Sequence, residues 1–194
     1  SSIQRLCKEL LGLLGLILVT LIVGSAVFAP WLVPHDPIAI DVMNRLKAPS
    51  WEHWLGTDQL GRDVFSRVLM GGQVALIVAV SAISLALGCG LLLGLIAGFG
   101  PAWLDHIIVT LFDTVRSFPT IIFALAVVTL TGPSLTTIIL VVVVTSIPIY
   151  GRVVRTQTQA LSAQEFILAE RALGASMPRV LWVHMLPNVI GQLL

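Results

Sequence analysis

Long uncharged apolar runs, separated by short polar stretches, dominate the pattern along the chain. The segments from Leu10 to Ala29 and from Gly71 to Phe99 contain no charged residue. Because a helix rises about 1.5 Å per residue, about 20 residues cross a hydrocarbon core of about 30 Å. Leu104 to Leu130 and Leu135 to Tyr150 are further apolar runs. The pattern therefore predicts four membrane-spanning helices. The first is expected to be an uncleaved anchor, because it exceeds the apolar core of about 7–15 residues of a signal peptide.

The third run differs from the others because it carries ionisable residues. Asp105 lies near its start, and Asp113 and Arg116 lie deeper. Residues three positions apart share a helix face, and charges at such depth normally face a bundle interior or a watery cavity. Two interpretations follow: Asp113 and Arg116 form a local structural salt link, or they line a translocation path. Pro119 is expected to kink this helix.

Composition supports a membrane protein of the all-α class. Of 194 residues, 57% are hydrophobic and 11% are charged, whereas soluble domains carry about 25% charged residues. We therefore expect a polytopic transmembrane helical bundle in contact with lipid. The net charge of +1 argues against a nucleic-acid partner. Cys7 precedes the first span and Cys89 lies inside the second, so a disulfide between them is not expected.

The second run contains glycines at a spacing of four residues, at Gly90, Gly94 and Gly98. Small residues at this spacing allow helices in lipid to approach closely. We favour packing against another span of the same chain over a contact between subunits.

The longest polar loop, residues 31–70, is rich in proline and tryptophan and contains HWLGTDQLGRDVFSR at residues 53–67. This segment resembles the HxLGTDxxGRDxxSR signature of permeases in the dipeptide, oligopeptide and nickel importer group. Glycines permit tight turns, and carboxylates can bond within a loop. The residues either hold the shape of the loop or contact a substrate-delivery protein. The signature positions of interest are Gly56, Thr57, Asp58, Gly61, Arg62 and Asp63.

Two histidines of the loop, His35 and His53, have no spacing typical of a metal site. We therefore interpret them as ordinary surface residues and predict no metal site.

A polar stretch from Gln159 to Pro187 predicts two short helices separated by a glycine turn. Ser162 lies three residues before Glu165, which is the spacing of a capping box, and Gly174 is suited to end the first helix. The stretch resembles the EAA loop of ABC-importer permeases, which couples the membrane subunit to its ATPase. Leu168, Glu170 and His184 depart from the usual pattern. The resemblance implies an ATPase-docking role for Glu165, Ala169, Glu170 and Gly174.

The resemblance also implies an architecture, that of the ABC type I importer permease. Residues 1–30 would form the N-terminal tail and first span, and residues 31–70 an extracytoplasmic loop. Residues 71–194 would form the permease core, with spans two to four, cytoplasmic coupling helices at about 160–185 and the start of a fifth span. Such permeases have six spans, so we expect this chain to be a fragment or a truncated product.

The partners that the resemblance implies are a second homologous permease subunit, two cytosolic ATPase subunits and an extracytoplasmic solute-binding protein. The chain lacks a GxxxxGK[ST] motif, so ATP and Mg²⁺ are expected on the ATPases and no cofactor on this subunit. Basic residues near the N-terminus and the docking stretch favour a cytoplasmic N-terminus in a bacterial inner membrane.

Transport of peptides, nickel or similar small solutes is therefore the leading hypothesis, and the solute is left open. A membrane pore or scaffold without ATP coupling is the alternative, but it would not explain the paired docking helices. An intramembrane enzyme is disfavoured because the sequence has neither GxSxG nor HExxH. No catalytic residue is predicted.

Overall fold

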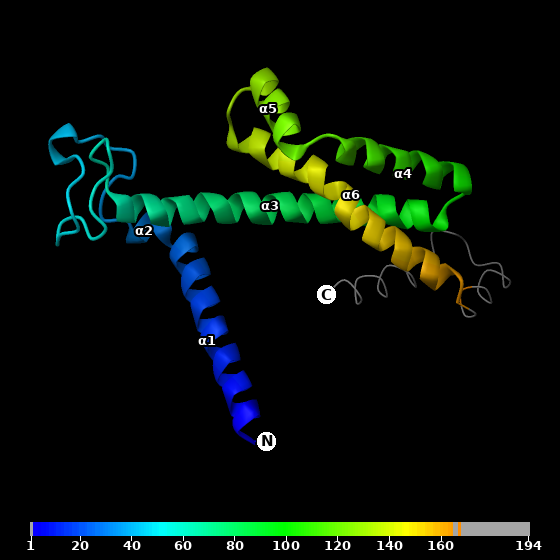
Figure 1. Ribbon diagram of the computed structural model, residues 1–194, viewed down its shortest axis with the longest axis horizontal. Coiled ribbons are helices and arrows are strands. Elements are labelled where there is room, and N and C mark those ends of the chain that lie inside the picture. Colours follow the sequence, from blue (N-terminus) through cyan, green and yellow to red (C-terminus); the bar gives the residue numbers. More distant parts are fainter. Residues whose placement is uncertain (1, 165–166, 168–194) are drawn as a thin grey trace. The chain divides into compact units, whose positions relative to one another are not determined.

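A computed structural model describes residues 2–164 and 167. The regular elements of this part are helices, and the strand-like pairing in it is one isolated bridge between Thr57 and Asp63. The expected all-α class is therefore confirmed. The chain divides into two compact units, Ser1–Val78 and Ala79–Leu194, which are described separately (Figure 1).

The first unit contains helix α1 (Ser2–Val27), the short helix α2 (Ala29–Leu32), a 3₁₀ turn η1 (Val42–Asn44) and the beginning of α3 (Val64–Phe99). Pro30 lies in the first turn of α2, where proline fits because the first helical N–H groups have no partner within the helix. The part of α1 whose side chains are described, Leu11–Val27, is apolar but shorter than a full span. The polar loop follows α2 and ends where α3 begins.

The second unit contains the rest of α3, then α4 (Ala102–Ser117), α5 (Thr120–Thr131) and α6 (Leu135–Ser162). By length and composition, α3 and α6 can each cross a membrane. The described part of the chain thus offers two such helices, or three if α4 and α5 count as one broken span.

The third apolar run is not one kinked helix, as expected, but two helices that meet at 87°. At the break, Phe118 has an extended backbone, and Pro119, with a φ of −56° and a ψ of 124°, is not helical either. Proline has no N–H to donate and disfavours a helical conformation in the residue before it. The position of the interruption was therefore predicted correctly and its extent was underestimated.

Helix α6 is longer than the predicted fourth span, because it continues from Tyr150 to Ser162 without interruption. Pro148 lies inside the helix and is buried. Arg152 and Arg155, which were expected to follow the span, therefore belong to the same rigid element as its apolar part.

The glycines of α3 pack directly against α6. A Cβ atom added to Gly90 would lie 2.8 Å from Tyr150 Cβ, and one added to Gly98 would lie 2.6 Å from Thr158 Cβ. Gly94 meets the backbone of Gly151 in the same way. The prediction that this spacing serves packing within the chain is confirmed.

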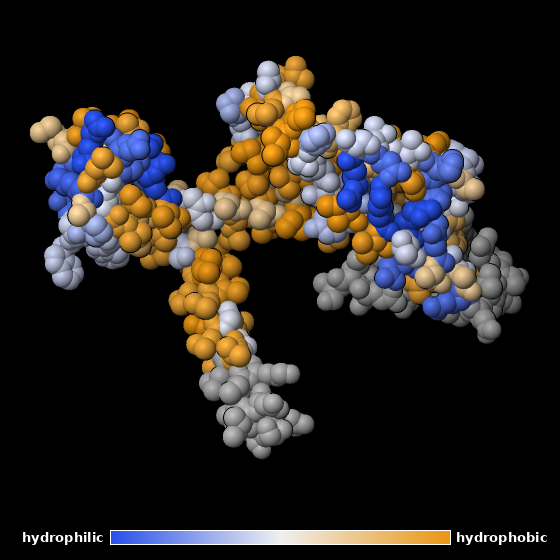
Figure 2. Space-filling view, in the orientation of Figure 1, coloured by the Kyte–Doolittle hydropathy of each residue, from blue (hydrophilic) through white to orange (hydrophobic). Residues whose placement is uncertain are grey.

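A small apolar core joins α3, α4 and α6. Its buried members are Ala97, Ile108 and Phe112. Most other apolar side chains of the helices are exposed, and Figure 2 shows hydrophobic residues over much of the visible surface of α1, α5 and the middle of α3. Lipid or further protein must cover these surfaces in a membrane, because contiguous exposed apolar area of this extent is not found on soluble monomers.

Candidate functional site

The signature segment of the loop forms tight turns at its two glycines. Gly56 has a φ of 74° and Gly61 a φ of 77°, a region that glycine adopts at little cost. A Cβ atom at Gly61 would lie 1.6 Å from the carbonyl oxygen of Asp41, so only glycine fits there. The sequence-based interpretation of both glycines is confirmed.

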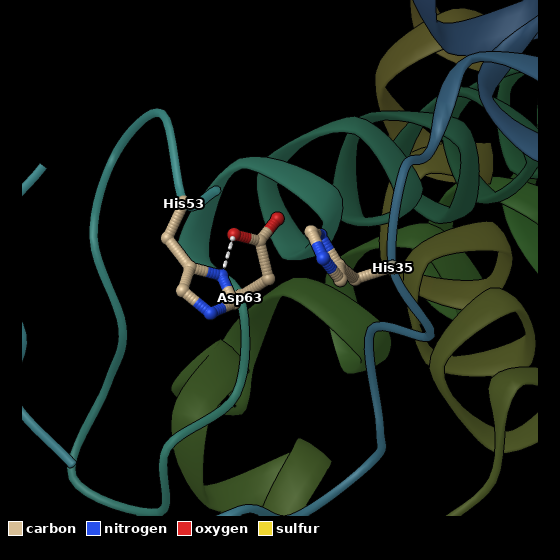
Figure 3. Close-up of side chains that lie close together, drawn as sticks. All are labelled: His35, His53 and Asp63. Carbon is tan, nitrogen blue, oxygen red and sulfur yellow. Dashed lines mark hydrogen bonds and ion pairs between the residues drawn. The ribbon is translucent and has the colours of Figure 1, made fainter. Parts of the chain in front are cut away.

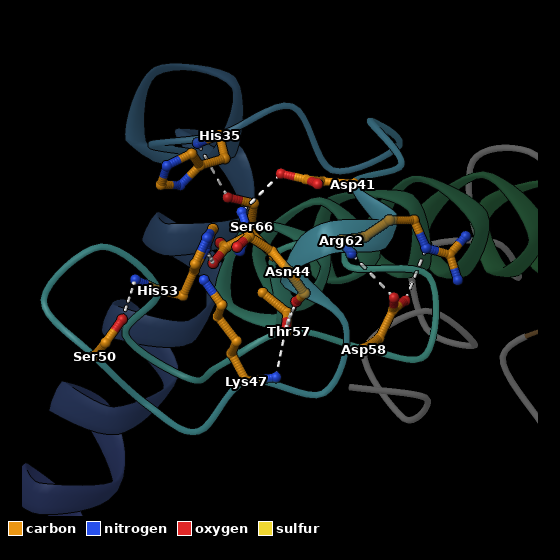
Figure 4. Close-up of polar contacts among 11 residues, drawn as sticks. His35, Asp41, Asn44, Lys47, Ser50, His53, Thr57, Asp58, Arg62 and Ser66 are labelled. Carbon is orange, nitrogen blue, oxygen red and sulfur yellow. Dashed lines mark hydrogen bonds and ion pairs between the residues drawn. The ribbon is translucent and has the colours of Figure 1, made fainter.

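Asp58 closes the turn between the glycines (Figure 4). Its Oδ1 accepts hydrogen bonds from the backbone N–H groups of Leu60 at 2.8 Å and Arg62 at 3.1 Å, and its Oδ2 accepts from Arg62 Nε at 2.7 Å. Desolvation by itself raises the pKa of Asp58, but these donors outweigh it, so the pKa lies below its usual value. The ionised form of Asp58 therefore stabilises the turn.

Thr57 ties the signature to the preceding part of the loop. Its hydroxyl donates to the carbonyl oxygen of Asn44 and accepts from the backbone N–H of Lys47 at 2.8 Å. Thr57 is buried, so both bonds are shielded from water.

Asp63 lies directly before α3, among His35, His53 and Ser66. Its Oδ2 accepts from the Ser66 backbone N–H at 2.8 Å, and its Oδ1 lies 2.9 Å from His53 Nδ1. Burial by itself raises the pKa of Asp63, but the bonds from Ser66 and His53 lower it below its usual value. The prediction that His53 is an ordinary surface residue is wrong, because the loop folds over it and leaves it 8% exposed.

The signature side chains thus bond mainly to one another and to the rest of the loop. This arrangement favours the interpretation that they hold the shape of the loop. Contact with a substrate-delivery protein remains a prediction.

A second polar site joins α4 to α6. Arg155 donates from Nε to Asp105 Oδ1 at 2.5 Å and from Nη2 to Asp105 Oδ2 at 2.7 Å. Arg152 pairs with Asp113. Paired hydrogen bonds between a guanidinium and a carboxylate fix geometry as well as charge. The two pairs therefore hold α4 against the C-terminal half of α6.

Of the two interpretations of Asp113 and Arg116, the local link between them is wrong, because Asp113 pairs across helices with Arg152 instead. Both Asp113 and Arg116 are exposed. Their lining of a translocation path stays a prediction.

The roles of Arg152 and Arg155 as partners of Asp113 and Asp105 were not predicted from the sequence. A signal was present, because two arginines three positions apart follow the fourth apolar run, and the third run contains two aspartates. The pairing order, Asp105 with Arg155 and Asp113 with Arg152, is that of antiparallel helices.

The residues expected to dock an ATPase, Glu165, Ala169, Glu170 and Gly174, lie outside the described residues. Ser162, the expected first member of a capping box, is instead the last residue of α6. Its hydroxyl donates to the carbonyl oxygen of Gln159 at 2.8 Å. The segment Glu165 to Gly174 therefore begins three residues after the end of a helix that reaches back to Leu135.

Comparison with known proteins adds close relatives over the whole chain. The chain is 38% identical over 194 residues to the dipeptide transport system permease protein DppC of Alkalihalophilus pseudofirmus, covering 100% of this chain and 64% of that protein. It is 35% identical over 192 residues to a putative peptide permease protein of Brucella abortus, and the match covers 99% of this chain and 64% of that protein. It is 38% identical over 191 residues to the glutathione transport system permease protein GsiD of Shigella dysenteriae, and the match covers 98% of this chain and 63% of that protein. The chain thus spans less than two thirds of the length of these relatives.

Two family profiles match different parts of the chain. Residues 1–49 match the N-terminal TM domain of oligopeptide transport permease C. Residues 90–194, more than half of the chain, match the binding-protein-dependent transport system inner membrane component. With its membrane-length helices and these matches, the chain belongs to the family of inner membrane components of binding-protein-dependent transport systems.

Proposed function

We propose that this chain is part of a permease subunit of an ATP-driven importer for small peptides. The observation that carries the proposal is α6, a continuous helix of 28 residues that runs from an apolar half to the edge of the segment resembling the EAA loop. The names of the relatives, which refer to dipeptide, peptide and glutathione transport, support peptides as the solute class. Nickel has no comparable support among them.

Helix α6 would connect the membrane to the ATPase, because it is continuous from Leu135 to Ser162. A continuous helix that runs from a membrane span to a residue just before the docking segment would transmit a displacement along its axis. Asp105 and Asp113 bind its arginines, so α4 would move together with α6 as one body. Rigid-body motion of such bundles is the established way for transporters to alternate access.

The remaining partners complete this mechanism. Two cytosolic ATPases would hold the residues around Glu165 to Gly174, and a second homologous permease would complete the path. A solute-binding protein would deliver the peptide on the side of the loop that contains residues 53–67. This subunit itself would perform no covalent chemistry, and its N-terminus would lie in the cytoplasm.

Reconstitution of the full-length permease with its second subunit, ATPases and binding protein tests the proposal. Uptake of a labelled dipeptide into proteoliposomes should require ATP, and ATP hydrolysis should require the permease. Uptake that continues without the ATPases would instead support a pore or scaffold.

Charge exchange tests the role of the ion pair. Arg155→Asp alone should lower the amount of peptide imported per ATP hydrolysed, because α4 is released from α6. The double variant Asp105→Arg with Arg155→Asp should recover part of that loss. Equal coupling in the wild type and the single variant would contradict the rigid α4–α6 body.

A further inference from the structure

Three side chains of the first unit converge at the start of α3, although they lie far apart in sequence. His35 follows α2, His53 lies in the middle of the loop and Asp63 directly precedes α3. One ligand atom from each lies within 4.8 Å of the others. The two imidazole rings are 4.8 Å apart between centroids and tilted by 38°, and the Asp63 carboxylate lies next to both rings (Figure 3).

The cluster has an unsatisfied donor or acceptor. His35 Nδ1 is buried and has no hydrogen-bond partner within residues 2–164 and 167. Buried polar atoms normally have a partner, and each exception in a folded protein requires an explanation. The atom belongs to a residue that clusters with two typical metal ligands, an imidazole and a carboxylate. A bound ion would give His35 Nδ1 the partner that the protein does not provide.

We propose that His35, His53 and Asp63 bind one transition-metal ion of the Zn²⁺ class. Imidazole nitrogen suits Zn²⁺ and its neighbours, whereas Mg²⁺ and Ca²⁺ prefer sites made of oxygen ligands. Three protein ligands leave a fourth position for water or for a group from another molecule. This assignment does not depend on the transport function proposed above.

The ligand atoms need to move only slightly to surround one ion. In a tetrahedral site with metal–ligand bonds of about 2.0–2.1 Å, the ligand atoms lie about 3.3 Å apart. His53 Nδ1 and Asp63 Oδ1 are already 2.9 Å apart, so they need to separate slightly. The widest separation, 4.8 Å, would need to close by about 1.5 Å. Rotation of the His35 side chain can provide this, because His35 is only half-buried.

Neighbouring groups hold the ligands in place. The Ser66 backbone N–H occupies Asp63 Oδ2 and leaves Oδ1 to face the ion. The Ser66 hydroxyl also accepts from the backbone N–H of His35 at 3.3 Å, which fixes that segment beside α3. Such supporting hydrogen bonds orient metal ligands and raise affinity. Binding through His53 Nδ1 requires the neutral tautomer with its proton on Nε2, so that Nδ1 offers a lone pair to the ion and Asp63 Oδ1 binds the ion instead of the imidazole.

Metal binding by the full-length chain tests the site. The protein, purified through a tag without histidine, is stripped with EDTA and dialysed against ZnCl₂, and bound zinc is measured by atomic emission. We expect one high-affinity Zn²⁺ per chain. Co²⁺ in its place should give visible absorption bands typical of low coordination number.

The variants His35→Ala and Asp63→Asn test whether these residues bind the ion or only support the fold of the loop. Each should lose at least about 10-fold in Zn²⁺ affinity, a loss typical even of residues that only support a ligand. His35→Ala is the cleaner variant, because it leaves the bond between His53 and Asp63 intact. His106→Ala is the matched control, because His106 is an exposed histidine on α4 outside the cluster.

Zn²⁺ should also slow amide exchange in residues 33–63 of the wild type and of His106→Ala, but not of His35→Ala. Absence of stoichiometric zinc from the wild type would overturn the proposal. Unchanged affinity in His35→Ala, or an equal loss in His106→Ala, would overturn it as well.

Discussion

Replacing Gly94 by alanine tests how closely α3 and α6 pack. A Cβ atom at this position lies 2.6 Å from the carbonyl oxygen of Gly151 and 2.6 Å from Val154 Cβ. Ordinary contact of a Cβ atom begins at 3.4 Å, so the atoms must separate by about 0.8 Å. Neither obstructing atom can rotate away, because one belongs to the backbone and the other is fixed to it. The two helices must therefore move apart.

The magnitude follows from a comparison within the same helix. Forcing extra carbon into a well-packed contact costs about 1–3 kcal/mol. Alanine in place of glycine also favours the helix by about 1 kcal/mol. Gly88 lies on α3 with no atom within 4 Å in the described part of the chain. Gly88→Ala therefore gains helix propensity without a steric cost. The Gly94→Ala protein should have a free energy of unfolding lower than that of Gly88→Ala by about 1–3 kcal/mol.

The assay is the free energy of unfolding of the full-length protein in mixed micelles, titrated with SDS. Gly12→Ala provides a second control on α1, where the added carbon meets no atom within 4 Å among residues 2–164 and 167. Equal stability of the Gly94 and Gly88 variants would refute the close approach of α3 and α6.

Two further predictions concern the loop. Gly61→Ala should expose the loop to rapid proteolysis, because the new carbon would lie 1.6 Å from the Asp41 carbonyl oxygen and the φ of 77° adds strain. Gly132→Ala is the matched control, because Gly132 has a φ of 84° but no atom of the described residues within 4 Å of the added carbon, so its effect should be much milder. Because the pKa of Asp58 is lower in the folded state, its stabilising contribution is complete above the pKa of the unfolded state and is lost as the pH falls through the folded value. In the wild type, amide exchange in the loop should therefore become faster relative to the intrinsic rate only below about pH 4. In Asp58→Asn, exchange should already be faster at neutral pH. A relative exchange rate in the wild type that does not change with pH would contradict this prediction.

The sequence could predict features that depend on the backbone conformation of a single residue, such as glycine turns and proline breaks. Gly56 and Gly61 adopt the left-handed turns expected of them, and the glycines of α3 form the expected contact with a helix of the same chain. Pro119 interrupts its helix as expected. Each of these depends on the residue itself and its immediate neighbours, so the amino-acid type nearly determines the outcome.

Pairing between distant segments could not be predicted in the same way. Asp113 had a sequence neighbour of opposite charge in Arg116, yet it pairs with Arg152, 39 residues away. The choice depends on how α4 and α6 pack, which spacing along one helix does not reveal. His35 and His53 meet because the loop closes on itself, and their separation in sequence gave no sign of it.

The corner at Phe118 and Pro119 limits where acyl chains can lie. A helix that ends leaves its last carbonyl groups without partners in the helix, and the next helix begins with unpaired N–H groups. Hydrocarbon cannot hydrate these groups, so an interrupted backbone inside a bilayer is stable only against water or other polypeptide. The break between α4 and α5 is therefore a point of the second unit from which lipid tails are excluded.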